Sequence, residues 1–88
     1  MIFIKLCKVR KKLTKEAIAE ATRSIERAKK EGVKFLNLYY TLGRYDIVVI
    51  YEAPDEKTAM RMAMRLGDIE STETHVAIPR EEATKLVE

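Results

Sequence analysis

The chain alternates between short apolar stretches rich in β-branched residues and longer stretches in which apolar residues recur at helical spacing. The β-branched stretches predict four strands, at residues 2–9, 33–42, 45–52 and 72–78. Only Gly43 and Arg44 separate the second strand from the third. A two-residue loop with glycine first is typical of a type II′ hairpin, in which Leu42 would face Tyr45 across the turn.

Two longer helices are predicted between the strands, each with a recognisable start and stop. The first lies between an N-cap at Thr14 and a stop at Gly32, and the second lies between Asp55 and Gly67. A short C-terminal helix is predicted over residues 80–88. The order βαββαβ predicts an α+β, ferredoxin-like fold, with a four-stranded antiparallel sheet and two helices on one face.

The predicted hairpin register divides the sheet into two faces, because side chains alternate along each strand. The helix-facing side is expected to hold Ile2, Ile4, Leu6, Leu36, Leu38, Tyr40, Leu42, Ile47, Val49, Tyr51, Thr72, Thr74, Val76 and Ile78. The open face would carry Phe3, Lys5, Cys7, Asn37, Tyr39, Thr41, Asp46, Val48, Ile50, Glu52, Glu73, His75 and Ala77. Four of these, Phe3, Tyr39, Val48 and Ile50, form an apolar patch that is unfavourable in water. We therefore expect a second copy to cover it in a two-fold dimer that encloses a small cavity.

Charge is distributed unevenly along the 88 residues. Residues 1–44 hold twelve Lys and Arg against four Glu, whereas residues 45–88 hold five against ten acidic residues. This asymmetry favours self-association, or a basic face that meets an anion, over a protein that coats nucleic acid. The 35% of charged residues and the absence of glutamine indicate a thermophile, although four methionines weigh against it. The short opening MIFIKL and the lack of an apolar run near the roughly 20 residues of a membrane span predict a cytoplasmic protein.

His75 is the candidate for general acid or base chemistry, because it is the single histidine and imidazole titrates near neutral pH. The sequence shows no partner to orient it, so a histidine that only donates or accepts a hydrogen bond is the plainer interpretation. The ligand-binding candidates around the expected cavity are Lys5, Tyr39, Asp46, Glu52 and His75. Asp46 and Glu52 would equally suit ordinary cross-strand ion pairs with Lys5.

The turn residues Gly43, Arg44, Tyr45 and Asp46 have two interpretations. As turn chemistry, glycine supplies a positive φ and aspartate accepts hydrogen bonds from nearby amides. As a functional segment, Arg44 and Tyr45 would lie at the dimer contact or the cavity mouth, where these residue types are favoured.

Other features of the sequence argue against metals, cofactors and nucleic acids. The single cysteine, Cys7, is expected to be a small buried hydrophobe, and no metal-ligand spacing or cofactor motif is present. A basic run formed by Lys8, Arg10, Lys11 and Lys12 lacks interleaved aromatic residues. The third strand would offer no aromatic platform for bases on its open face, so nucleic-acid binding is not predicted.

Residues 40–56, with TLG, then YD, an aliphatic run and EAPD, resemble the GYD domain family. The stretch TETHVAIP at residues 72–79 resembles the last strand of that family. The resemblance implies one GYD-like domain over residues 1–88, with a ferredoxin-like fold and a dimeric α/β barrel, and it brings no established activity. A more distant resemblance is to the ligand-binding domain of the Lrp/AsnC regulators, which implies an effector site between subunits.

The expected function is therefore that of a homo-oligomeric domain that binds a small effector or metabolite at the cavity between subunits. The expected partners are a second copy of the chain, in a dimer or a multiple of it, and a small molecule. Two alternatives stay open. One is a small cofactor-independent enzyme of the barrel monooxygenase or isomerase type that uses His75 with Tyr39 and Glu52, and the other is an assembly protein without a ligand.

Overall fold

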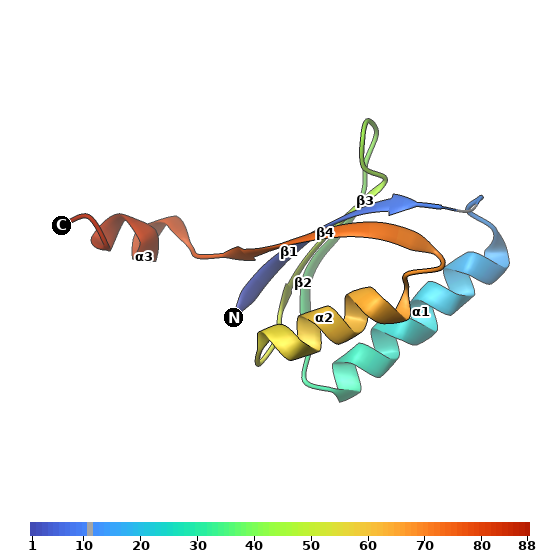
Figure 1. Ribbon diagram of the computed structural model, residues 1–88, viewed down its shortest axis with the longest axis horizontal. Coiled ribbons are helices and arrows are strands. Elements are labelled where there is room, and N and C mark those ends of the chain that lie inside the picture. Colours follow the sequence, from blue (N-terminus) through green and yellow to red (C-terminus); the bar gives the residue numbers. More distant parts are fainter. Residues whose placement is uncertain (11) are drawn as a thin grey trace.

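The computed structural model describes residues 1–10 and 12–88 and has the predicted order of elements (Figure 1). The strands are β1 (Ile2–Val9), β2 (Lys34–Tyr40), β3 (Ile47–Glu52) and β4 (Glu70–Ala77). The helices are α1 (Lys15–Lys30), α2 (Glu56–Arg65) and α3 (Arg80–Lys85). Helices α1 and α2 lie on one face of the sheet, which confirms the ferredoxin-like α+β fold. Of the basic run, Lys11 lies outside the described residues.

The helix boundaries follow the capping signals of the sequence. The Thr14 hydroxyl accepts a hydrogen bond from the Ala17 amide at 3.1 Å, and the Asp55 carboxylate accepts one from the Thr58 amide at 2.8 Å. Gly32 follows α1 with a φ of 96°, a left-handed conformation in which glycine is favoured. Among the helices of the described residues, none is long and apolar enough to cross a membrane.

The sheet has the strand order β2-β3-β1-β4, and every neighbouring pair is antiparallel. The predicted hairpin register is confirmed, since Tyr40 pairs with Ile47 and Leu38 pairs with Val49. The prediction of a tight two-residue turn was wrong. The strands end at Tyr40 and Ile47, so residues 41–46 form a longer loop, and Leu42 is fully exposed there instead of lying in the core.

A bulge in β2 corrects a second expectation. The register shifts between Phe35 and Asn37, which places Phe35 opposite Tyr51. Leu36, which was predicted to face the helices, is instead 38% exposed at the bulge. One extra residue in an antiparallel strand moves every residue beyond it to the other face, so strict alternation fails at this point.

The face assignment of β1 was also wrong. Phe3 pairs with Tyr51 and Cys7 pairs with Ile47, so Phe3, Lys5 and Cys7 face the helices. The open face carries the three aliphatic residues that were assigned to the core: Ile2, Ile4 and Leu6. Alternation could not decide between the faces, because both sets of residues in β1 are mainly apolar.

Aromatic packing closes one end of the core. The rings of Phe3 and Tyr51 stack with centroids 5.3 Å apart, and Phe35 lies 6.1 Å from the Tyr51 ring. Tyr51 is fully buried, and burial raises the pKa of its hydroxyl to about 12. Small neighbours complete this end of the core: Ala28, Val33, Ala53 and Ala59.

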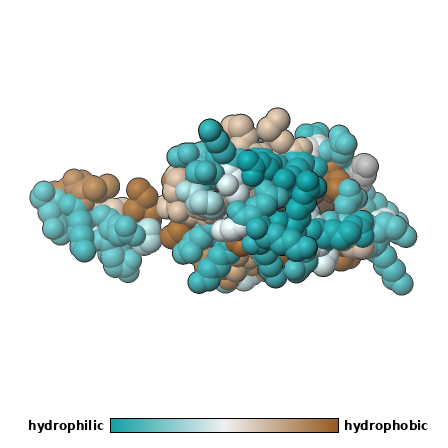
Figure 2. All heavy atoms as spheres, turned by 90° about the horizontal axis from the view of Figure 1, so that it is seen from below, coloured by the Kyte–Doolittle hydropathy of each residue, from teal (hydrophilic) through white to brown (hydrophobic). Residues whose placement is uncertain are grey.

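Helix α3 stands away from the rest of the fold at the C-terminal end (Figure 1). Its apolar neighbours are open to solvent, with Ile78 57%, Leu86 76% and Val87 89% exposed. Among the described residues, the hydrogen bonds of residues 80–88 stay within residues 79–88. We call residues 78–88 the C-terminal arm. In the space-filling view, hydrophobic residues lie along one side of this arm and hydrophilic residues along the other (Figure 2).

Tyr51 generates a prediction about stability. Within the described part of the chain, its hydroxyl is the one buried side-chain oxygen or nitrogen without a hydrogen-bond partner. Leaving such a group unpaired costs about 1–3 kcal/mol. Tyr51→Phe should therefore leave the free energy of unfolding unchanged or raise it by about 1 kcal/mol, as measured by urea denaturation.

Tyr45→Phe is the matched control, because the Tyr45 hydroxyl is hydrogen-bonded to Glu73 near the surface. It should lower the free energy of unfolding by no more than about 0.5 kcal/mol. A loss above about 1 kcal/mol in Tyr51→Phe would mean that the buried hydroxyl has a partner after all.

Candidate functional site

The structure divides the predicted ligand-binding residues between the two faces of the sheet. Tyr39, Glu52 and His75 belong to the open face, and Asp46 lies at its margin in the loop before β3. Lys5 lies on the opposite side, beneath the helices, so it joins none of the other four. The structure therefore has two candidate sites, the open face of the sheet and a cavity between the sheet and the helices.

The centre of the open face is aliphatic. Strands β1 and β3 run side by side there, and Leu6 pairs with Val48 while Ile4 pairs with Ile50. Polar residues lie on the flanking strands, with Asn37 and Tyr39 on β2 and Glu73 and His75 on β4. With Ile2, the central strands contribute five aliphatic side chains, so the open face is more apolar than the sequence indicated.

His75 has a partner that the sequence could not reveal. Its Nε2 lies 3.1 Å from Oε2 of Glu73, and the Tyr45 hydroxyl donates to the same oxygen at 3.3 Å. The hydrogen bond with His75, and then that from Tyr45, lower the pKa of the Glu73 carboxyl. Both side chains of the pair are more than half exposed, so this contact contributes little to stability. Its significance is that it orients the imidazole at the edge of the aliphatic centre.

Turn chemistry accounts for Gly43 and Asp46 of the Gly-Arg-Tyr-Asp segment. Gly43 has a φ of 113°, in the region that glycine favours. The Asp46 carboxylate accepts a hydrogen bond from the Val9 amide at 2.8 Å, and the Asp46 amide donates to the Cys7 carbonyl at the same distance. Asp46 thus attaches the loop to the end of β1. Tyr45 extends from this loop to Glu73, so the same segment also shapes the margin of the open face.

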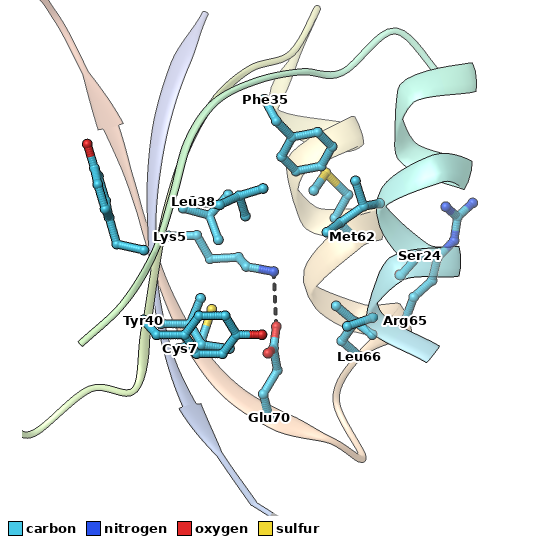
Figure 3. Close-up of a pocket in the computed structure, with 15 residues that line it drawn as sticks. Lys5, Cys7, Ser24, Phe35, Leu38, Tyr40, Met62, Arg65, Leu66 and Glu70 are labelled. Atoms are coloured by element: carbon cyan, nitrogen blue, oxygen red, sulfur yellow. Dashed lines mark hydrogen bonds and ion pairs between the residues drawn. The ribbon is translucent and has the colours of Figure 1, made fainter. Parts of the chain in front are cut away.

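A cavity of about 150 Å³ lies between the helices and the sheet (Figure 3). Its walls are mainly apolar and include Phe35, Leu38, Ile47, Val49, Met62 and Leu66. At its polar end, the Lys5 ammonium donates to Oε1 of Glu70 at 3.0 Å, and the two side chains are only 6% and 8% exposed. Figure 3 shows the two side chains pointing toward each other from β1 and from the start of β4.

The cavity exists because several residues at this end are small and the edge strand β2 does not seal it. Helix α1 contributes Ala21 and Ser24, and β1 contributes the small side chain of Cys7. On the edge strand β2, Leu38 is 49% and Tyr40 is 67% exposed, so neither seals the space. The core is therefore closed at its aromatic end and half-open beside β2.

Cys7 lines the cavity beside the ion pair but is not a nucleophile at neutral pH. Burial raises the pKa of its thiol to about 12, the charge of Lys5 opposes that shift, and Glu70 adds to it. The reactive form of a cysteine is the thiolate, which is scarce at neutral pH when the pKa is so high. Among the described residues, no group of three or more His, Cys, Asp or Glu is arranged to hold a metal ion.

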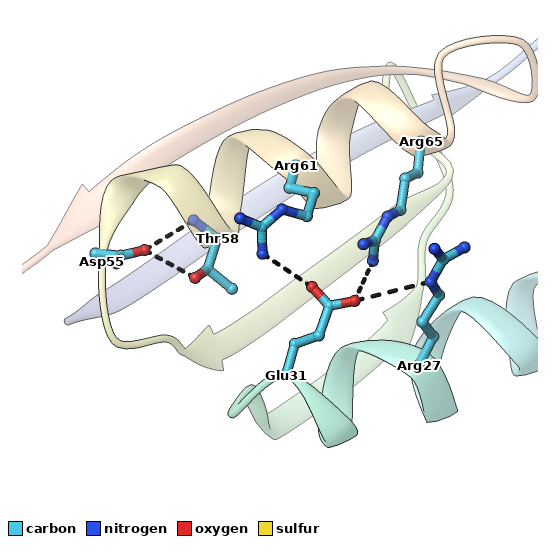
Figure 4. A network of polar contacts seen from close by, with 6 residues as sticks. All are labelled: Arg27, Glu31, Asp55, Thr58, Arg61 and Arg65. Atoms are coloured by element: carbon cyan, nitrogen blue, oxygen red, sulfur yellow. Dashed lines mark hydrogen bonds and ion pairs between the residues drawn. The ribbon is translucent and has the colours of Figure 1, made fainter.

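Glu31 joins the two long helices near the cavity (Figure 4). Its carboxylate, at the end of α1, accepts hydrogen bonds from Arg65 and from Arg61 of α2, the latter at 3.1 Å, and Arg27 lies 3.8 Å away. The hydrogen bonds from Arg65 and then Arg61 lower the pKa of the Glu31 carboxyl. Since Arg65 also lines the cavity, this network fixes the helix that forms one wall.

Sequence reasoning missed two residues that organise these sites. Glu70 sits just beyond α2, at the first position of β4, where nothing nearby indicates a buried carboxylate. Glu31 follows the last helical residue of α1 and looks like an ordinary surface acid. Lys5 lies 65 positions away from Glu70, and Arg61 of α2 lies 30 positions away from Glu31. Local periodicity carries no information about pairs so far apart.

The fold and the open face define a small α+β domain of ferredoxin-like architecture. Residues 7–87 match the family model of the GYD domain, so the chain belongs to the GYD domain family. This confirms the resemblance of residues 40–56 to that family. No curated protein matches the sequence significantly. Among solved structures, the "De novo designed protein Foldit4" is similar with a TM-score of 0.49 and 16% identity, over 90% of this chain and 96% of that chain. That likeness carries no argument about function.

The Glu31 network predicts a pH-dependent stability. Glu31 has a lowered pKa in the folded state, so its contribution is complete above the unfolded carboxyl pKa of about 4.3 and is lost as the pH falls through the folded value. Glu31→Gln should therefore have a lower Tm than the wild type at pH 7, and the difference should shrink between about pH 5 and pH 3. Thermal unfolding followed by circular dichroism measures this.

Glu26→Gln is the control, because Glu26 forms a single exposed contact with Lys29 at 3.3 Å, of the kind that adds little stability. Its Tm should follow the wild type across the same range. A constant Tm difference between wild type and Glu31→Gln from pH 7 to pH 3 would contradict the network.

Proposed function

We propose that this GYD domain forms a homodimer, or a multiple of one, through the open face of its sheet and binds a small molecule at the margin of that interface. The observation that carries the proposal is the aliphatic centre made by Ile2, Ile4, Leu6, Val48 and Ile50. Helices α1 and α2 cover the other face of the sheet (Figure 1). Fully burying an exposed aliphatic side chain contributes about 1.5–3 kcal/mol. These five side chains are already half-buried in the single chain, so each would contribute a part of that amount when a second copy covers them.

The C-terminal arm supports the same proposal from a different direction. Strands of six to eight residues in a four-stranded sheet cover roughly 400 Å² in projection. A stable interface buries about 800 Å² of accessible surface per partner, so a contact outside this small sheet would strengthen the dimer. A six-residue helix such as α3 is too short to persist by itself. We infer that Leu86 and Val87 of the arm pack against the second copy.

The polar margin of the open face is where we place the small molecule. Tyr39 and Asn37 lie on one side of the aliphatic centre, and the Glu73–His75 pair with Tyr45 lies on the other. Two sheets stacked by a two-fold axis would bring such margins around a shared space with apolar walls. This combination is typical of small-molecule sites, in which a few polar groups orient a ligand within an apolar enclosure. Lys5 is excluded from this site by its position.

One alternative has a specific observation in its favour. An imidazole oriented by a carboxylate is the arrangement that general acid or base catalysis uses, and His75 with Glu73 has it. Of the other residues proposed for this enzyme, Tyr39 accepts a hydrogen bond from Asn37 at 3.0 Å. Glu52 lies at the end of β3 and pairs with Ile2, whereas His75 pairs with Ile4. Glu73 is thus the better partner for His75.

The dimer is tested by placing a charge at the centre of the open face. Native mass spectrometry of the wild type should show a dimer or its multiple at micromolar concentration. Ile50→Lys should be a monomer, because a lysine there would bury its charge against a second copy. Ile18→Lys is the matched control, since Ile18 lies on α1 and is already 44% exposed, and it should remain a dimer. A monomeric wild type would contradict the proposal.

The same spectra distinguish ligand binding from pure assembly. An additional mass retained by the wild-type dimer, and lost in a still dimeric His75→Gln variant, would support a site at the margin. A retained mass that is unchanged in His75→Gln would remove His75 from the site. A dimer with no retained mass would favour the assembly alternative.

Substitutions in the C-terminal arm should also weaken the dimer, independently of the open face. Leu86→Ser combined with Val87→Ser should raise the dimer dissociation constant at least about tenfold, because two apolar side chains lose their contact with the partner. Sedimentation equilibrium measures this constant. Lys85→Ser, one position earlier in the arm, should leave it within about threefold. Equal dissociation constants for all three proteins would exclude the arm from the interface.

A further inference from the structure

We propose that the cavity beneath the helices is a second binding site, on the opposite side of the sheet from the dimer margin, for a neutral ring-sized molecule that carries one hydroxyl group. The proposal is independent of dimer formation. Its basis is a buried ion pair that faces an apolar space instead of packed side chains (Figure 3).

The ion pair is incompletely satisfied. The Lys5 ammonium has three N–H donors, and within the described residues it makes one hydrogen bond, to Glu70. Its side chain is 6% exposed, so water in the bulk phase does not reach it freely. Removing charges from water costs several kcal/mol per ion unless further hydrogen bonds compensate. A ligand oxygen at the polar end of the cavity would provide such compensation.

The charge of the site selects a neutral ligand. Lys5 and Glu70 already neutralise each other, and Arg65, which also lines the cavity, is paired with Glu31. A carboxylate placed beside Lys5 and Glu70 would therefore add an unpaired negative charge to an apolar space. A hydroxyl fits both partners, because its oxygen accepts a hydrogen bond from the Lys5 ammonium and its proton is donated to the Glu70 carboxylate. The site therefore discriminates between a hydroxyl group and an anion of similar size.

The size and lining of the cavity select the rest of the molecule. A dry protein cavity of about 150 Å³ binds benzene, and this cavity has about the same volume. Its walls are the side chains of Phe35, Leu38, Val49, Met62 and Leu66, which suit an aromatic or alicyclic ring. The partly exposed edge at Leu38 and Tyr40 provides the route of access.

Phenol is the probe, with benzene and benzoate as matched comparisons, and binding is read from ¹H–¹⁵N chemical-shift titrations of the full chain. We expect phenol to shift the amide signals of Lys5, Cys7 and Glu70 and to bind about tenfold tighter than benzene, the difference that one or two buried hydrogen bonds make. Benzoate should bind more weakly than phenol. Equal affinity for phenol and benzene, tighter binding of benzoate, or no shifts at these amides would each overturn the proposal.

Variants of Lys5 and Glu70 test the contribution of the ion pair separately from that of the apolar walls. The double variant Lys5→Met with Glu70→Met replaces the ion pair by apolar side chains of similar length, a change that folded proteins often tolerate. It should bind benzene at least as tightly as phenol. If it does not fold, Glu70→Gln keeps the shape of the side chain and should reduce the preference for phenol.

A cavity-filling variant completes the test. Ala21→Leu places a larger side chain in the cavity and should weaken binding of both phenol and benzene at least tenfold. Unchanged binding in Ala21→Leu would show that the molecules bind elsewhere and would overturn the proposal. Because the signals are read at residues beneath the helices, failure of the open-face dimer would leave this result interpretable.

Discussion

The pairing register of β1 is the constraint on which the other features depend, because β1 lies between β3 and β4 and assigns a face to every side chain it contributes. In the observed register, Phe3 stacks on Tyr51 and Lys5 meets Glu70 beneath the helices. A slip of one residue would turn both side chains to the open face. It would also leave Glu70 buried without its cation, a state that typically costs 3–5 kcal/mol. One strand pairing therefore determines the aromatic core, the cavity and the aliphatic open face together.

The two faces of the sheet differ in what covers them. On the helix side, stacked aromatic rings close one end, the Glu31 network joins the end of α1 to α2, and the other end of the core stays half-open. On the open side, five aliphatic residues lie in the centre of a surface without helices. A chain of this size buries only about 60–70% of the surface of its unfolded state. Apolar surface that the monomer does not cover, on the sheet and on the arm, is thus available for association.

Local signals were sufficient for the elements and insufficient for the sites. Thr14 and Asp55 were identifiable as helix caps because capping depends on residues within one turn. The face of β1 was not identifiable, because lysine rarely enters a core and the aliphatic alternative looked more buried. The burial of Lys5 depends on Glu70, which is 65 positions away and is recognisable only after folding. The bulge at Leu36 was likewise not predictable, because no local residue pattern indicated it.

The most direct measurement is an isotope-filtered NOE experiment on a dimer assembled from labelled and unlabelled chains. It reports which side chains of one subunit lie within a few ångströms of the other. We expect intersubunit contacts among the methyl groups of Ile4, Leu6, Val48 and Ile50, and none from the ring of Phe3. Intersubunit contacts that involve Phe3 or the α1 residue Ile18, without the methyl groups of the open face, would contradict both the β1 register and the proposed interface.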